Sequence, residues 1–198
     1  MSNDWLQYQN QNATRNQPLS PRLTGALNFL PEMGVTMRVF SGGQDAIGHG
    51  DRRTGSVRHD HGDAADADFY MGDRKLDWNN QADIPVLQDI VRRARSRGVT
   101  GFGAGDDYMG AGRMHIGFGE EAVWGAGGSS ANAPAWLQSA VAGVELGAGH
   151  SVGDGHNHGG AGDTSLQGQQ ASDVLTVTPQ QTAGAYQAYI NGQMSPEA

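Results

Sequence analysis

The chain has 198 residues, of which 31 are glycine and 37% are hydrophobic. This length predicts one compact domain with a tail and excludes a multidomain machine, while the glycine content predicts a modest core with many loops. The formal net charge of -8 argues against binding to nucleic acids or to anionic membranes.

Cysteine is absent, so any metal site must use histidine and carboxylate ligands. No apolar run approaches the ~20 residues of a membrane-spanning helix. The first residues lack the basic segment followed by an apolar one that marks a cleaved export signal. We therefore expect synthesis in the cytoplasm, without a signal peptide.

The first elements of the chain follow from local patterns. Residues 1–18 are rich in Asn and Gln and predict an arm that docks on a domain formed by residues 19–142. Ser20 as N-cap predicts a short amphipathic helix, and Asp83 as N-cap predicts a longer one. Between them, the alternation of apolar and polar residues over 35–40 predicts a strand.

Two further strands are predicted by alternation, at 64–71 and 113–118, each with one apolar and one polar face. The polar face of the first carries Asp66 and Asp68, and that of the second carries His115. Together the elements predict an α+β fold: a small, mainly antiparallel sheet with flanking helices and a metal site on the polar strand face.

The C-terminal part differs in composition. Residues 143–170 are rich in glycine and include three histidines, which predicts a flexible linker. Residues 171–198 predict a tail with one possible short helix. We assign no function to the histidines of the linker, namely His150, His156 and His158.

The residues with the clearest chemistry lie in the segment 56–66 and at His115. A hydrolytic zinc site needs three protein ligands and an open position for water. His59 and Asp66 come from a loop and the strand that it enters, and His115 lies on the polar face of another strand. The three side chains can therefore converge across a sheet and hold zinc.

The same segment resembles a known family signature. Ser56, His59, Gly62, Ala64 and Asp66 match the pattern Ser-x-x-His-x-x-Gly-x-Ala-x-Asp of the zinc D-alanyl-D-alanine carboxypeptidase and L-alanyl-D-glutamate endopeptidase family. These enzymes, which include phage endolysins, cleave peptide bonds in peptidoglycan.

In that family the third zinc ligand is a His on a later strand, and Gly-Arg-Met-His-Ile-Gly at 112–117 resembles that element. The match is His115. The resemblance covers roughly residues 19–140 and implies a zinc peptidase whose ligands are His59, Asp66 and His115.

Two positions depart from the family pattern. Where many members have an Arg that steadies charge on the scissile carbonyl, this chain has Gln44, which can donate a hydrogen bond but carries no charge. Arg113, on the same strand face as His115, is a substitute candidate. Where the family commonly has its general base, three residues before the last His, this chain has Gly112. Asp106 and Asp107 in the preceding loop and Glu120 after the strand are the alternatives, and we favour Asp107.

Other polar residues near the motif have supporting roles in this interpretation. His61 is an alternative ligand, but the resemblance places it at the rim of the site or in contact with a ligand. Asp68 orients a ligand His or binds a substrate amine, or is simply solvated. Ser56 and Gln44 are assigned to substrate binding or to support of the ligands.

The expected function is zinc-dependent hydrolysis of a peptide bond in the stem peptide or cross-link of peptidoglycan. Without an export signal, the protein is expected to reach the wall as a phage endolysin or within a phage-like particle, where the tail contacts other particle proteins. A secreted antagonistic toxin would share the chemistry. The alternative is a non-catalytic structural or binding module that keeps the peptidase fold, which Gly112 and Gln44 favour.

Overall fold

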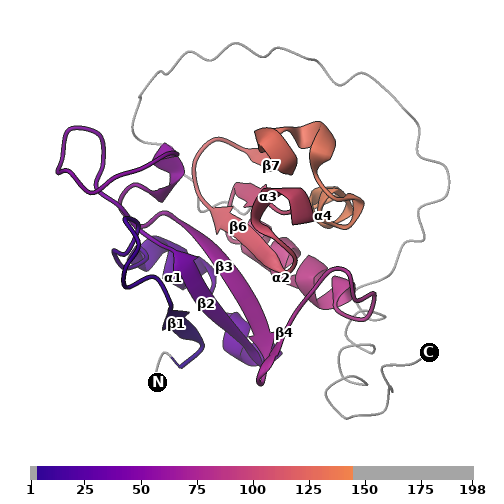
Figure 1. The fold of residues 1–198 in the computed structure, drawn as a ribbon. Helices are drawn as coiled ribbons and strands as arrows, with labels where there is room; N and C mark the ends of the chain where they lie inside the picture. Colours follow the sequence, from indigo (N-terminus) through magenta and orange to yellow (C-terminus); the bar gives the residue numbers. More distant parts are fainter. Residues whose placement is uncertain (1–3, 145–198) are drawn as a thin grey trace. The chain divides into compact units, whose positions relative to one another are not determined.

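The computed structural model describes residues 4–144, in which helices and seven strands form an α+β fold around one mixed sheet (Figure 1). The strand order is β1-β2-β3-β6-β5-β7, and β4 pairs with β3. The strands are β1 (Leu6–Tyr8), β2 (Val35–Ser41), β3 (Ala64–Met71), β4 (Arg74–Lys75), β5 (Gly101–Gly103), β6 (Arg113–Gly117) and β7 (Ala122–Trp124).

The predicted α+β class is confirmed, but the expectation of a mainly antiparallel sheet is wrong. The central pairings β2–β3, β3–β6 and β5–β6 are antiparallel, whereas β1–β2 and β5–β7, at the two ends of the sheet, are parallel. The parallel pairs arise because each end strand is connected to its neighbour through an intervening element instead of a tight hairpin.

The N-terminal arm supplies β1, which pairs with β2 in the register Leu6–Met37 to Tyr8–Val39. This segment therefore docks by extending the sheet. The strand β1 could not be predicted from the sequence, because it has only three residues and the strand that it pairs with lies about thirty positions later.

The helices within residues 4–144 are mostly short. They are α1 (Pro21–Ala26), α2 (Ile84–Ser96), α3 (Asp106–Met109), α4 (Ala135–Val141) and the 3₁₀ helices η1 (Leu30–Met33), η2 (Val57–His59), η3 (Ala126–Gly128) and η4 (Ser130–Asn132). The predicted cap of α1 is confirmed, since Ser20 Oγ accepts a hydrogen bond from the Leu23 amide at 3.1 Å.

Asp83 precedes α2, as predicted, but its side chain makes no capping hydrogen bond. Its fully buried carboxylate instead accepts two hydrogen bonds of 2.7 Å from the guanidinium of Arg74 and one of 3.1 Å from the Asp77 amide. The bidentate ion pair thus ties β4 to the start of α2, because a guanidinium is a stronger partner for a buried carboxylate than helix amides.

The alternating pattern of the central strands separates an apolar from a polar face, as predicted. Ala67 of β3 pairs with Val39 of β2 and Met114 of β6, and all three side chains are fully buried. Leu23 of α1 and the apolar stripe of α2 are buried as well. The opposite face, with Asp66 opposite His115, carries the polar groups.

No helix within the described part of the chain is both long and apolar enough to cross a membrane. The predicted linker at 143–170, apart from its first two residues, and the tail at 171–198 lie outside the described residues.

Candidate metal centre

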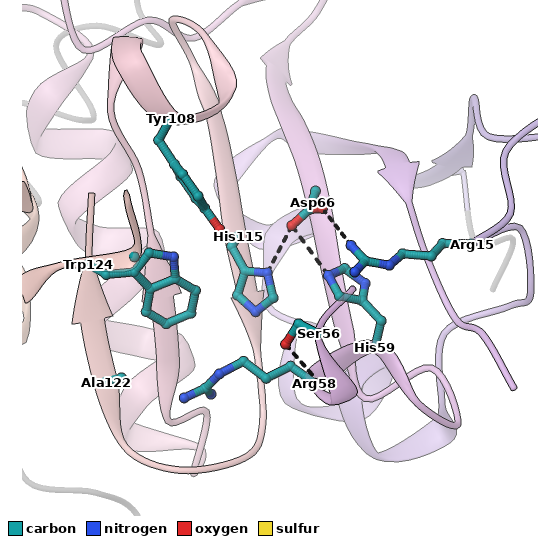
Figure 2. Close-up of a pocket in the computed structure, with 10 residues that line it drawn as sticks. Arg15, Ser56, Arg58, His59, Asp66, Tyr108, His115, Ala122 and Trp124 are labelled. Atoms are coloured by element: carbon teal, nitrogen blue, oxygen red, sulfur yellow. Dashed lines mark hydrogen bonds and ion pairs between the residues drawn. The ribbon is translucent and has the colours of Figure 1, made fainter. Parts of the chain in front are cut away.

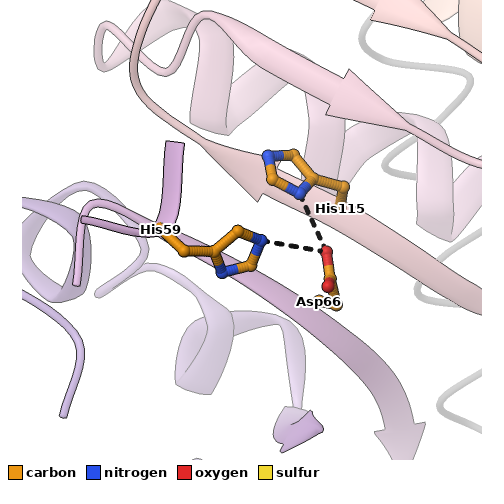
Figure 3. A group of neighbouring side chains, drawn as sticks. All are labelled: His59, Asp66 and His115. Carbon is orange, nitrogen blue, oxygen red and sulfur yellow. Dashed lines mark hydrogen bonds and ion pairs between the residues drawn. The ribbon is translucent and has the colours of Figure 1, made fainter. Parts of the chain in front are cut away.

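Three potential metal ligands meet on the polar face of the sheet (Figure 3). Asp66 lies on β3, directly opposite His115 on β6, and His59 ends the helix η2 that leads into β3. One donor atom from each side chain lies within 4.8 Å of the others. The arrangement confirms that His59, Asp66 and His115 form a group that could hold a metal ion.

Both imidazoles face the same carboxylate oxygen. His115 Nδ1 lies 2.8 Å from Asp66 Oδ1, and His59 Nε2 lies 3.5 Å from it. The other ring nitrogen of His59, Nδ1, lies 2.9 Å from the carbonyl oxygen of Gly42. A carbonyl can only accept, so Nδ1 of His59 carries a proton, and in the neutral form of the imidazole the Nε2 lone pair points at Asp66.

In that neutral form the lone pair of His59 and the carboxylate oxygen of Asp66 have no proton between them, and a cation would satisfy both. The donor set of two imidazole nitrogens and one carboxylate oxygen is one that divalent transition metals accept. The carbonyl of Gly42 also orients His59 in the way that supporting hydrogen bonds orient metal-binding histidines. The residues therefore fit a metal ion.

Burial and neighbouring charges favour the metal-binding protonation states of Asp66 and His115. His59 and His115 are almost fully buried, and the side chain of Asp66 is 13% exposed. Burial raises the pKa of Asp66, but hydrogen bonds with His115 and His59 lower it more, so the net pKa lies well below its usual value. Burial lowers the pKa of His115, and its hydrogen bond with Asp66 offsets only part of this shift.

The three ligands open into a cavity of about 420 Å³ (Figure 2). Its wall also includes Arg15, Ser56, Arg58, Tyr108 and Trp124. Nε2 of His115 is buried and has no hydrogen-bond partner among the described residues. The site thus combines a possible metal position with an accessible volume and two positive side chains.

Close packing explains why the motif has small residues at positions 62 and 64. Gly62 adopts a φ of 80°, and a Cβ there would lie 2.4 Å from the carbonyl oxygen of Pro18. Ala64 pairs with Gly117 of β6, where a Cβ would lie 2.4 Å from the Cβ of Ala64. A larger residue at 64 would push the strand that carries Asp66 away from the strand that carries His115, whereas a side chain at 62 would clash with residues 18–20.

Ser56 lines the cavity and caps η2, because its Oγ accepts a hydrogen bond of 3.2 Å from the Arg58 amide. This cap fixes the turn that carries His59. Ser56 therefore supports a ligand, which is one of the roles predicted for it.

Gln44 does not line the cavity but supports a residue that does. Its fully buried amide donates to Ser56 O at 2.9 Å and to Asp60 Oδ1 at 2.7 Å, and its Oε1 accepts from Arg15 Nε at 3.3 Å. Arg15 in turn places Nη1 3.6 Å from Asp66 Oδ2. The N-terminal arm therefore brings a guanidinium to the site, and Gln44 helps to hold it there.

Arg113, the substitute predicted from the sequence, lies on the predicted face but does not line the cavity. Its guanidinium makes two hydrogen bonds to Asp68, of 3.0 and 2.9 Å, and lies over the ring of Phe40. Lys75 binds the same carboxylate at 3.0 Å. Asp68 is thus engaged in a local ion cluster on β3, β4 and β6 and contacts neither ligand His.

The remaining predicted residues lie outside the cavity wall. His61 is exposed and has a left-handed φ of 60°. Asp107 on α3 and Glu120 after β6 are also exposed, whereas Tyr108, beside Asp107, lines the cavity and extends toward His115 (Figure 2). Asp66 is the only carboxylate among the lining residues described.

Sequence reasoning missed Arg15, Arg58, Tyr108 and Trp124 as parts of the site. Trp124 lies with its ring 4.9 Å from that of His115, in space left by Gly103, where a Cβ would lie 2.5 Å from the indole. Arg58 directly precedes the candidate ligand His59 in the sequence, and this position could have indicated that it lies near the site. Arg15 has no local signal, since only the fold brings the arm to Asp66.

Comparison of the chain with family models, with curated proteins and with solved structures gives no match.

Proposed function

We propose that the chain is a zinc-dependent peptidase that cleaves a peptide bond in the stem peptide or cross-link of peptidoglycan. The observation that carries this proposal is the convergence of His59, Asp66 and His115 on one open cavity that is also lined by two arginines. The resemblance of the segment 56–66 to the zinc peptidase signature supplies the substrate class.

Zinc suits two imidazoles and one carboxylate, and when bound it acts as a Lewis acid and lowers the pKa of a coordinated water to about 7. The chain provides the ligands in the required forms. Gly42 holds the proton of His59 on Nδ1, and the low pKa of Asp66 keeps its carboxylate ionised.

Arg15 is proposed to stabilise negative charge that develops on the scissile carbonyl oxygen. Its guanidinium lines the cavity at the carboxylate of Asp66 and is held by Gln44 and by the carbonyl oxygen of Thr54, at 2.7 Å from Nη2. A donor fixed in this way can act without reorganising during the reaction, which is the property that charge stabilisation requires.

A proton must also be transferred to the leaving amine. Asp107 and Glu120 remain the carboxylate candidates, although both are exposed and outside the cavity wall. Tyr108 lines the cavity, and its hydroxyl is the additional candidate for this transfer.

The second candidate function is a non-catalytic structural or binding module of a phage-like particle that retains the metal site. The specific observation in its favour is that Asp66 is the only carboxylate among the described lining residues, so no acid beside the ligand faces the cavity.

Mass spectrometry of purified peptidoglycan before and after incubation tests the proposal. The zinc-loaded protein should release new amino termini, a chelator should abolish the release, and added zinc should restore it. If the zinc-loaded protein releases none from peptidoglycan of several chemotypes, the structural module is the better account. An endolysin or particle-borne enzyme should act when added from outside to permeabilised cells.

A further inference from the structure

Arg58 lines the cavity on the side away from Arg15, and its guanidinium is held in place by the surrounding backbone. Its side chain leaves η2 next to His59 and crosses to the turn after β6, where Nη1 donates to Phe118 O at 3.2 Å and Nη2 donates to Glu120 O. Figure 2 shows the guanidinium below the ring of Trp124, and its carbon lies 4.9 Å from that ring's centroid.

Glycines make room for this side chain. A Cβ at Gly101 would lie 2.4 Å from Nη1 of Arg58, and one at Gly119 would lie 3.0 Å from the same atom. Backbone from two segments, at 101 and 118–120, therefore surrounds the guanidinium and fixes where it points. Because its position is held by neutral carbonyls and an indole, the positive charge stays available to a ligand.

The other arginines near the site differ in this respect. Arg15 lies beside Asp66, Arg53 beside Asp60 and Arg113 beside Asp68, each within ion-pair distance. Among the described residues, no carboxylate lies within that distance of Arg58. Its hydrogen-bond acceptors are main-chain oxygens, and the exposed Glu120 acts on its charge only from beyond ion-pair distance.

The balance of charge in the cavity favours an anionic ligand. Two guanidiniums line it against one carboxylate, and a divalent cation at His59, Asp66 and His115 would add further positive charge. The volume of about 420 Å³ lies at the lower end of the range for small-ligand sites and suits the end of a peptide more than a long chain.

We propose that Arg58 binds a free carboxylate of the substrate, so that the site selects peptides carrying such a group next to the scissile bond. This inference rests on the proposed peptidase function and adds the substrate feature that the site recognises. The carboxylate can be the terminal carboxylate of the peptide, as in a carboxypeptidase substrate, or the free α-carboxylate of a γ-linked glutamyl residue.

The test is calorimetric binding of uncleavable peptides to the full-length zinc-loaded protein. The first pair is acetyl-D-alanyl-D-alanine with its scissile amide reduced to CH₂–NH, as the free acid and as the terminal amide. The second pair is the equally reduced L-alanyl-γ-D-glutamyl amide, with its α-carboxylate free or amidated. Arg58→Gln is compared with Arg52→Gln, an exposed arginine in the loop before η2, and zinc content and thermal stability are measured for each variant.

In the wild type, the free acid of at least one pair should bind about 10-fold or more tightly than its amide. The difference should disappear in Arg58→Gln and persist in Arg52→Gln. The pair that shows the difference identifies the carboxylate recognised. Equal binding of acid and amide in both wild-type pairs would overturn the inference, as would a preference for the acid that survives in zinc-loaded Arg58→Gln.

If Arg58→Gln does not fold, Arg58→Lys replaces it, with a reduced preference expected because the planar fork of donors is lost; an undiminished preference would count against the inference. Because binding is measured with uncleavable peptides, absence of peptidoglycan cleavage would contradict the proposed function without removing the acid preference.

Discussion

Nη1 of Arg15 lies 3.6 Å from Oδ2 of Asp66, so the N-terminal arm places a guanidinium beside the carboxylate of the candidate metal centre. The arm is held by β1, which pairs with β2, and by the contact of Arg15 with Gln44. A segment that looked peripheral in sequence is therefore part of the site.

Arg15→Gln should lower kcat for peptide hydrolysis by about 100-fold, because a fixed donor to the developing oxyanion is lost. The zinc content should stay near that of the wild type, since Arg15 is not a ligand. Arg38→Gln is the matched control, because Arg38 lies on the same sheet and contacts Gln7 and Tyr70 instead of the cavity. An unchanged kcat in Arg15→Gln would remove Arg15 from the mechanism.

Proton transfer can be assigned by three conservative variants. Tyr108→Phe should lower kcat by about 100-fold, whereas Asp107→Asn and Glu120→Gln should have smaller effects, because only Tyr108 lines the cavity. Steady-state rates with zinc content measured in parallel decide among them. A loss confined to Asp107→Asn or to Glu120→Gln would restore the carboxylate assignment made from the sequence.

Gly112 cannot be replaced by the acid that the family pattern places there. Its φ is 74°, and a Cβ would lie 2.4 Å from the carbonyl oxygen of Leu76. Gly112→Glu should destabilise the protein by at least about 2 kcal/mol, from backbone strain together with this clash.

Gly110→Glu is the control for Gly112→Glu, because Gly110 also has a positive φ, of 83°, but a Cβ there would have nothing within 4 Å. Chemical denaturation should show a clearly larger loss for Gly112→Glu than for Gly110→Glu. Equal losses would mean that the contact with Leu76 plays no part.

The low pKa of Asp66 predicts a pH-dependent stability of the metal-free protein. Since its pKa is lower in the folded than in the unfolded state, ionised Asp66 stabilises the fold above the unfolded pKa of about 3.9. That contribution is lost as the pH falls from there through the folded pKa, with a slope of at most about 1.4 kcal/mol per pH unit.

Urea denaturation of the wild type and Asp66→Asn between pH 3 and 6, with chelator present, measures this contribution. The difference in unfolding free energy should be constant near pH 6 and should shift against the wild type below about pH 4. A difference that does not vary with pH would show that Asp66 has the same pKa in both states.

The parts of the fold that were predicted correctly rest on local patterns. Alternation over 64–71 predicted the bounds of β3 and the separation of its faces, because successive side chains of a strand point to opposite sides. The strand faces of Asp66 and His115 predicted that the two side chains can converge, but their direct pairing was not predicted, since strand register is set by tertiary packing. Asp83 shows the limit of local reasoning, because its cap position was correct while its carboxylate binds Arg74.

The proposed function depends most directly on a metal ion bound by His59, Asp66 and His115, and elemental analysis of the purified protein tests for this ion. The wild type should carry about one zinc per chain, and His59→Ala, Asp66→Ala and His115→Ala should each lose most of it, because three-ligand sites weaken steeply when one ligand is removed. A variant in which His150, His156 and His158 are all replaced by alanine should keep the zinc. Zinc content unchanged in His115→Ala, or lost only from the triple variant, would contradict the assignment.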